Sequence, residues 1–152
     1  MPSKKIPARS GCPVAGALDV LGDRWTLLVV RDLVFVGRRE FGEFIAAGEG
    51  IATNILTDRL GRLCCAGLVA RFDHATDGKK YVYRITEMGL DLLPAMIELI
   101  LWSVKYLPGL DVPPGKLDPI VKDRAKFIRE LRAHLLAELK AAGKPLPPPA
   151  CR

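Results

Sequence analysis

The sequence predicts a mainly α-helical domain that carries one β-hairpin. Apolar residues recur at helical spacing over most of the chain. Residues 68–86 are instead rich in β-branched and aromatic side chains, and they are interrupted by the turn signal of Thr76, Asp77 and Gly78. Nearly half of the 152 residues are apolar, which is enough for one domain with a substantial core and leaves no room for a second full domain.

Three short helices are expected at the start of the chain. Pro13 is suited to the first position of a helix with Cys12 as its cap, because that position needs no backbone N–H. Asp23 is a favourable N-cap for the second helix, which is expected to end at Gly37. A third helix is expected over residues 40–47, where aromatic and aliphatic side chains share one side.

A fourth helix is expected from Ala52 or Thr53 to Gly67, with two faces of different character. Its predicted buried residues are Leu56, Leu60 and Leu63. Its predicted exposed residues are Thr53, Asn54, Thr57, Asp58 and Arg62. The exposed face carries small hydroxyl and amide groups where a surface helix usually has Glu and Lys. This composition suits a helix that must fit against base edges and phosphates.

The hairpin is followed by a long helix, from about Glu87 to Tyr106, and then by a second amphipathic helix. The segment PGLDVPPGK between them has the composition of a linker, and KPLPPPACR after them is proline-rich. The predicted divisions are a flexible arm (1–10), a main domain (11–106), a linker (107–117), an additional helix (118–142) and a disordered tail (143–152).

This order of elements is that of a winged helix-turn-helix, an α+β fold, with dimerisation helices at its two ends. The helix over 87–106 is apolar on more than one stripe, so it is expected to pack on a second copy of the chain. The resulting homodimer is expected to involve the first helix, this long helix and the terminal helix. The predicted interface residues are Val14, Leu18, Leu93, Ile97, Leu101 and Trp102.

The net charge of +6 is unevenly distributed. Residues 1–115 hold 14 basic and 13 acidic side chains, whereas residues 116–152 hold 9 and 4. Bulk charge therefore indicates nucleic-acid binding only weakly, because the main domain is close to neutral. The apolar runs are short for a bilayer and the N-terminus lacks the apolar segment of a signal peptide. A cytoplasmic protein without membrane contact is expected.

Four cysteines, Cys12, Cys64, Cys65 and Cys151, lack the spacing of a metal site or a redox motif. In the cytosol they are expected to remain thiols, with Cys64 and Cys65 packed in the core. No pair of carboxylates, nucleophile with a base or phosphate-binding loop stands out in the sequence. We therefore expect a protein that is not an enzyme and that binds no metal and no cofactor.

Three stretches of the sequence resemble one family of regulators. They are CPVAGALDVLGDRWTLLVVRDLVFVGRREFGEF, GIATNILTDRLGRLCCAGLVAR and YVYRITEMGLDLLPAMIELILW, in a single order over residues 11–106. They are similar to the HxlR-type winged-helix transcription regulators, distant relatives of the MarR group. The family usually has Arg at Glu40, a Ser at Ala52 and a proline near Gly78. Because Ala52 replaces the usual Ser, capping of the fourth helix is expected from Thr53.

The resemblance and the two-faced fourth helix together predict double-stranded DNA as the partner. Asn54 and Arg62 can make paired hydrogen bonds to base edges, whereas basic residues of the hairpin would contact phosphates. Arg59 has a second interpretation, because it could brace the fold through an internal acid. The predicted DNA-binding residues are Arg38, Arg39, Thr53, Asn54, Thr57, Arg59, Arg62, Lys79, Lys80 and Arg84. The alternative for the fourth helix is a solvated face, and the alternative for Lys79, Lys80 and Arg84 is a basic edge that limits strand pairing.

Cys12 is the predicted redox-sensing residue. A thiol at a helix N-terminus is favoured as the thiolate, and Lys5 and Arg9 are close to it in sequence. The resemblance implies the same role, since several HxlR-type regulators use a cysteine at this position to sense oxidants or electrophiles. The alternative is a half-buried cap without reactivity.

The resulting hypothesis is a homodimeric repressor that binds a pseudo-palindromic operator and responds to oxidants or electrophiles through Cys12. Two alternatives stay open, a regulator that senses a small apolar ligand at the dimer interface and a winged-helix module that binds proteins instead of DNA. The sequence leaves open the operator and its genes, the sign of regulation, the nature of the signal and the role of the helix over 118–142.

Overall fold

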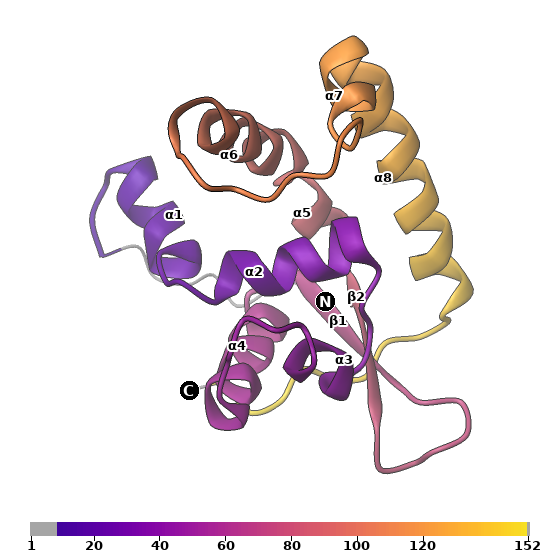
Figure 1. The fold of residues 1–152 in the computed structure, drawn as a ribbon. Helices are drawn as coiled ribbons and strands as arrows, with labels where there is room; N and C mark the ends of the chain where they lie inside the picture. The colour runs from indigo at the N-terminus through magenta and orange to yellow at the C-terminus, as the bar shows by residue number, and fades with distance from the viewer. Residues whose placement is uncertain (1–8, 152) are drawn as a thin grey trace.

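The computed structural model describes residues 9–151, and Figure 1 shows their arrangement. Helices surround a two-stranded antiparallel hairpin, which confirms the predicted mainly α fold with a β-hairpin wing. The elements in chain order are α1 (Pro13–Leu21), α2 (Thr26–Arg31), the π-helical η1 (Asp32–Val36), α3 (Phe41–Ile45), α4 (Thr53–Cys65), β1 (Val69–Asp73), β2 (Tyr81–Ile85), α5 (Glu87–Leu90), α6 (Leu93–Tyr106), α7 (Asp118–Lys122) and α8 (Arg124–Ala141). No helix in this described range is both long and apolar enough to cross a membrane.

Two of the predicted helices are interrupted, each for a local reason. The helix expected over 87–106 is divided into α5 and α6, because Pro94 has no backbone N–H to bond the carbonyl four residues earlier. The C-terminal helix is divided into α7 and α8 at Asp123. The Asp123 carboxylate accepts a hydrogen bond from the Lys126 N–H (2.9 Å) and so caps α8.

The orientation of α4 is set by its apolar face. Leu56, Leu60 and Leu63 are almost completely buried, and the helix packs against α2, α3 and β1. Burial of each leucine side chain contributes about 1.5–3 kcal/mol. The predicted inner face of this helix is therefore confirmed, and the opposite face is exposed to solvent.

The wing, which is the β1–β2 hairpin with its turn, is attached to the chain before α3. The Tyr83 N–H in β2 donates to the Arg39 carbonyl (2.8 Å), and Glu40 forms an isolated bridge with Val82. Since α3 and β1 both pack on α4, these bonds hold the wing and α4 in a fixed relation.

Helix α8 returns the C-terminal region to the hairpin (Figure 1). Its Leu135 is buried in the core, and its Glu138 carboxylate accepts hydrogen bonds from Arg39 (2.7 Å) and Arg84 (2.9 Å). Burial alone would raise the pKa of Glu138. The hydrogen bond and charge of Arg39, with the charges of Arg84 and His134, hold that pKa below its ordinary value.

Helix α8 also contacts α6, and burial within the chain changes the expected dimer interface. Arg124 of α8 forms an ion pair with Glu98 of α6. Leu93 and Ile97 are 1% and 0% exposed, so they belong to the core of the chain, which corrects the prediction that they form the interface. The other predicted interface residues are partly or fully exposed, namely Val14, Leu18, Leu101 and Trp102.

The tail differs from the disordered segment that the sequence predicts. The Leu146 N–H donates to the Arg71 carbonyl in β1 (2.8 Å), and Cys151 forms a disulfide with Cys65 at the end of α4. The prediction that all four cysteines remain thiols is therefore wrong, and so is the prediction that Cys65 is packed in the core. The disulfide forms because the chain returns to α4 after α8, which brings together two cysteines that are 86 positions apart in the sequence.

We predict that Glu138→Gln lowers the free energy of unfolding at neutral pH by on the order of 1–3 kcal/mol, because two arginines lose a charged acceptor. The folded-state pKa of Glu138 lies below its ordinary value of 4.5. Its stabilising contribution is therefore complete above that ordinary value and is lost as the pH falls through the folded-state value.

Urea unfolding of this variant and the wild type, at neutral pH and over a series of pH values below 4.5, measures the effect and its loss in acid. Glu130→Gln is the matched control, because Glu130 is 66% exposed and its contact with Lys126 is long at 3.9 Å. Equal stability of the Glu138→Gln protein and the wild type at neutral pH would contradict the prediction.

Candidate nucleic-acid interface

The exposed face of α4 is formed by small and polar residues. Asn54, Asp58, Gly61 and Cys65 recur at helical spacing and form one stripe opposite the buried leucines, named here the α4 stripe. Arg62 lies beside it, and although its Nε is 2.9 Å from the Asp58 carboxylate, its side chain is 66% exposed. A helix with this face can approach another surface closely.

The start of α4 has no side-chain cap. Its N-cap residue is Ala52, which has no acceptor for the N–H groups of the first turn. The expectation that Thr53 caps the helix is wrong, because Thr53 is the first helical residue and its carbonyl accepts the Thr57 hydroxyl (2.8 Å). The positive end of this 13-residue helix is therefore left to an external anion such as a phosphate.

Arg59 braces α4 against the start of α2, which is one of the two roles that the sequence leaves open. Its Nε lies 3.3 Å from the Asp23 carboxylate, and its side chain is only 19% exposed. Asp23 also accepts hydrogen bonds from the Thr26 hydroxyl and from the N–H groups of Trp25 and Thr26. Burial would raise the pKa of Asp23, but these hydrogen bonds and then the charge of Arg59 lower it.

The turn of the wing is held by its own polar groups. The His74 Nδ1 accepts from the Asp77 N–H (3.1 Å), and the Asp77 carboxylate accepts from the Lys79 N–H (3.0 Å). Lys80 is 59% exposed, and its Nζ is 3.7 Å from Asp77, so this ion pair is weak in water. The turn therefore presents two exposed lysine side chains, those of Lys79 and Lys80.

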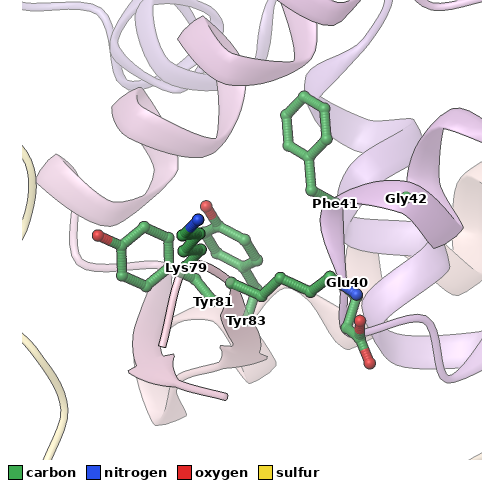
Figure 2. A pocket seen from close by; sticks show the side chains of 7 residues that line it. Glu40, Phe41, Gly42, Lys79, Tyr81 and Tyr83 are labelled. Carbon is green, nitrogen blue, oxygen red and sulfur yellow. The ribbon is translucent and has the colours of Figure 1, made fainter. Parts of the chain in front are cut away.

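A shallow groove of about 390 Å³ lies between the wing and the start of α3. Figure 2 shows Lys79, Tyr81 and Tyr83 from the wing on one side and Glu40 and Phe41 on the other. The Glu40 carboxylate would repel an anion in this groove, and its Oε1 is 3.4 Å from the His74 ring. The groove is therefore part of the wing surface and not a separate anion pocket.

Three further arginines from the predicted set have carboxylate partners inside the chain. Arg38 is 2.8 Å from the buried Asp32, and Arg39 and Arg84 share Glu138. Arg39 is only 16% exposed. Each of these arginines is thus bound to a carboxylate, and Arg39 and Arg84 share a single one. Six of the predicted residues are exposed, namely Thr53, Asn54, Thr57 and Arg62 on α4 and Lys79 and Lys80 at the turn of the wing.

Cys12 is the N-cap of α1, as the sequence predicts, and its thiol is free and exposed. Arg9, one of the two basic residues expected near it, is 3.5 Å from Asp19, whereas Lys5 lies outside the described residues. Cys64 is the opposite case, since burial raises the pKa of its thiol to about 11. A thiol with that pKa stays protonated at neutral pH and reacts slowly.

Exposed apolar side chains gather on α1 and α6. Helix α1 buries none of its nine residues, and Val14 and Leu18 are 67% and 58% exposed. On α6, the rings of Trp102 and Tyr106 are 5.8 Å apart and both are exposed. Leu99 and Tyr106, which the sequence analysis does not name, are also exposed on α6, three residues before and four residues after Trp102.

Comparison with known proteins identifies the type of domain. The pattern of the HxlR-like helix-turn-helix family matches residues 20–111. An uncharacterized HTH-type transcriptional regulator of Mycobacterium tuberculosis is 41% identical over 107 residues. That match covers 70% of this chain and 66% of the relative, which is just under two thirds of the relative's length.

Two solved structures have a similar fold. The redox regulator HypR, in its oxidized form, has a TM-score of 0.56 with 29% identity, and the match covers 66% of this chain and all of HypR. The transcriptional regulator YodB from B. subtilis, in its reduced form, has a TM-score of 0.53 with 26% identity, and the match covers 67% of this chain and all of YodB. The shared part is therefore the winged helix-turn-helix.

Proposed function

We propose that this chain, which belongs to the HxlR-like helix-turn-helix family, represses transcription by binding a pseudo-palindromic operator as a homodimer. The family makes the chain a transcriptional regulator with a helix-turn-helix DNA-binding fold and not an enzyme. Repression, the operator and the dimer are the parts that we add. The exposed face of α4 supports DNA binding, and the exposed apolar residues of α1 and α6 support the dimer.

The exposed face of α4 is the observation that carries the proposal for DNA. A helix whose small polar side chains and open N-terminus face solvent fits the major groove, and Asn54 and Arg62 have the functional groups that bond base edges. The wing lysines, Lys79 and Lys80, would contact phosphates on the same duplex. Arg39 and Arg84 have a smaller part in this proposal, because their side chains are only 16% and 25% exposed and both are bound to Glu138.

The exposed apolar residues of α1 and α6 support a homodimer. Val14, Leu18, Leu99, Trp102 and Tyr106 are all about half exposed or more, and a second copy of the same surface is a suitable cover. Two copies of α4 related by a two-fold axis would then bind two half-sites about one helical turn apart.

Cys12 is the residue that we propose as the sensor. Its thiol is free and exposed at the start of α1, so a group attached there would lie beside the proposed dimer surface. HypR is described as a redox regulator, which supports a similar input for this chain. Modification of Cys12 would change how the two subunits pack and thereby the distance between their α4 helices.

We predict that affinity for the operator falls steeply as salt rises and that the Lys79→Glu/Lys80→Glu double variant loses most DNA binding, because phosphate contacts release counterions. Asn54→Ala and Arg62→Ala should each cost on the order of 1–3 kcal/mol on the preferred duplex. Fluorescence anisotropy with the duplex upstream of the protein's own gene, and with a random duplex, measures both effects.

The control for the wing is Lys122→Glu/Arg129→Glu, which reverses two exposed charges on α7 and α8 and should leave affinity nearly unchanged. An affinity that does not depend on salt would exclude the DNA proposal. Equal losses on the random duplex would show that Asn54 and Arg62 contact the backbone and do not select a sequence.

We predict that Leu18→Glu and Trp102→Glu each produce monomers and abolish operator binding, because a buried glutamate cannot be tolerated in an apolar interface. Sedimentation velocity at micromolar concentration measures the change. Val121→Glu is the matched control, since Val121 is 71% exposed on α7, and this variant should stay dimeric. A folded wild-type monomer at that concentration would contradict the dimer.

We predict that a quinone releases the wild-type protein from DNA by alkylating Cys12, and that Cys12→Ser binds DNA but loses this response. A mobility shift with and without the quinone measures it. Cys64→Ala is the control and should respond like the wild type, because Cys64 is buried. If the Cys12→Ser protein still dissociates, the signal enters elsewhere and a ligand between the dimer helices becomes the better explanation.

A further inference from the structure

The C-terminal segment 144–151, named here the tail, crosses from β1 to α4 (Figure 1). The Leu146 N–H donates to the Arg71 carbonyl (2.8 Å), and the Arg71 guanidinium donates to the Pro147 carbonyl (3.2 Å). Beyond these bonds the tail reaches Cys65, to which Cys151 is joined with a Cα–Cα distance of 5.7 Å. The tail is thus attached at one end to β1 and at the other to the last residue of α4.

The tail ends on the face of α4 that is proposed to bind DNA. Cys65 belongs to the α4 stripe, four residues after Gly61 and eleven after Asn54. Pro149 lies over Gly61, because a Cβ atom on Gly61 would be 3.8 Å from the Pro149 ring. The tail therefore covers the second half of the stripe, and the first half, with Asn54, stays exposed.

This position is incompatible with full insertion of α4 into DNA. The major groove is about 12 Å wide, and a helix with its side chains has a diameter of about 10–12 Å. A second chain segment on the outward face of the helix has no room in that groove. The tail must leave Gly61 and Cys65 before the whole stripe can approach the bases.

We propose that Cys65 and Cys151 form a redox latch, in which their disulfide closes the tail over α4 and weakens DNA binding, and their reduction opens it. The latch rests on the proposed function, because it acts by covering the DNA-binding face. It is a second thiol site, separate from Cys12. Cys151 is exposed and accessible to small oxidants, and Cys65 is half-buried next to it.

The chemistry of closure balances with hydrogen peroxide as the oxidant. The Cys151 thiolate attacks one peroxide oxygen, the O–O bond breaks, and the second oxygen leaves as water, so that Cys151 becomes a sulfenic acid. The Cys65 thiol then attacks the sulfenic sulfur, and the sulfenic oxygen leaves as a second water. Two thiols and one peroxide give one disulfide and two waters. A thiol reductant reverses the step by thiol–disulfide exchange.

The composition of the tail explains why Cys151 reaches Cys65 and why reduction would release it. Four of its eight residues are proline, and a proline-rich segment is extended and stiff, so little conformational freedom is lost when it is closed. Its non-covalent contacts are few, since most of its residues are exposed. Without the disulfide these contacts are too weak to compete with DNA for the α4 stripe.

The test uses the full chain with Cys12→Ser, so that the proposed sensor is silent. One sample is reduced and one is oxidised with hydrogen peroxide, and mass spectrometry of the Cys65–Cys151 peptide pair verifies the loss of two hydrogens. Operator affinity by anisotropy should be about tenfold or more lower for the oxidised sample. Cys12→Ser/Cys151→Ser, and a chain lacking residues 144–152, should bind with the affinity of the reduced sample whether or not peroxide is added.

A second readout does not depend on DNA. Amide shifts of Gly61 and Arg71 by NMR should differ between the oxidised and reduced samples, because the tail leaves both residues on reduction. Equal operator affinity of the two samples, failure of the disulfide to form, or tail contacts that persist after reduction would each overturn the latch. A reduced Cys12→Ser protein that changes its Gly61 and Arg71 shifts but binds no duplex would instead refute the proposed function, and with it the effect of the latch on DNA.

Discussion

Burial of Leu56, Leu60 and Leu63 is the constraint on which the functional surface depends. These side chains fix the rotation of α4, so the α4 stripe on the opposite side must face away from the core. The Arg59–Asp23 ion pair adds a polar contact that holds the same helix against the start of α2. A slip of α4 by one residue would rotate its polar face toward the core, at the cost of burying unpaired polar groups.

The region after the family match changes the main domain in two ways. Helix α8 supplies Glu138, which binds Arg39 and Arg84, and Arg124, which binds α6 through Glu98. Among the basic side chains of α4 and the wing, those of Arg62, Lys79 and Lys80 are exposed. The tail then returns to α4 itself. The C-terminal extension is thus in contact with the helix that we propose to bind DNA.

Periodicity in the sequence was sufficient for the helices, the hairpin and the two faces of α4, because these depend on residues close in the chain. Periodicity was not sufficient for contacts between residues that are far apart in the sequence. Nothing in the sequence near Arg39 indicates an acceptor 99 residues later, and nothing near Cys65 indicates Cys151. Leu93 and Ile97 are a similar case, because the apolar pattern of α6 does not distinguish residues buried within the chain from residues left exposed for a second copy.

The most direct test of the account is a map of where DNA contacts the chain. Amide shift changes in ¹⁵N-labelled reduced protein, titrated with a duplex selected from a random pool, would provide it. The account predicts the largest changes at Thr53, Asn54, Thr57 and Arg62 and at the turn of the wing. Changes centred on the exposed basic side chains of α8, with α4 unaffected, would contradict it.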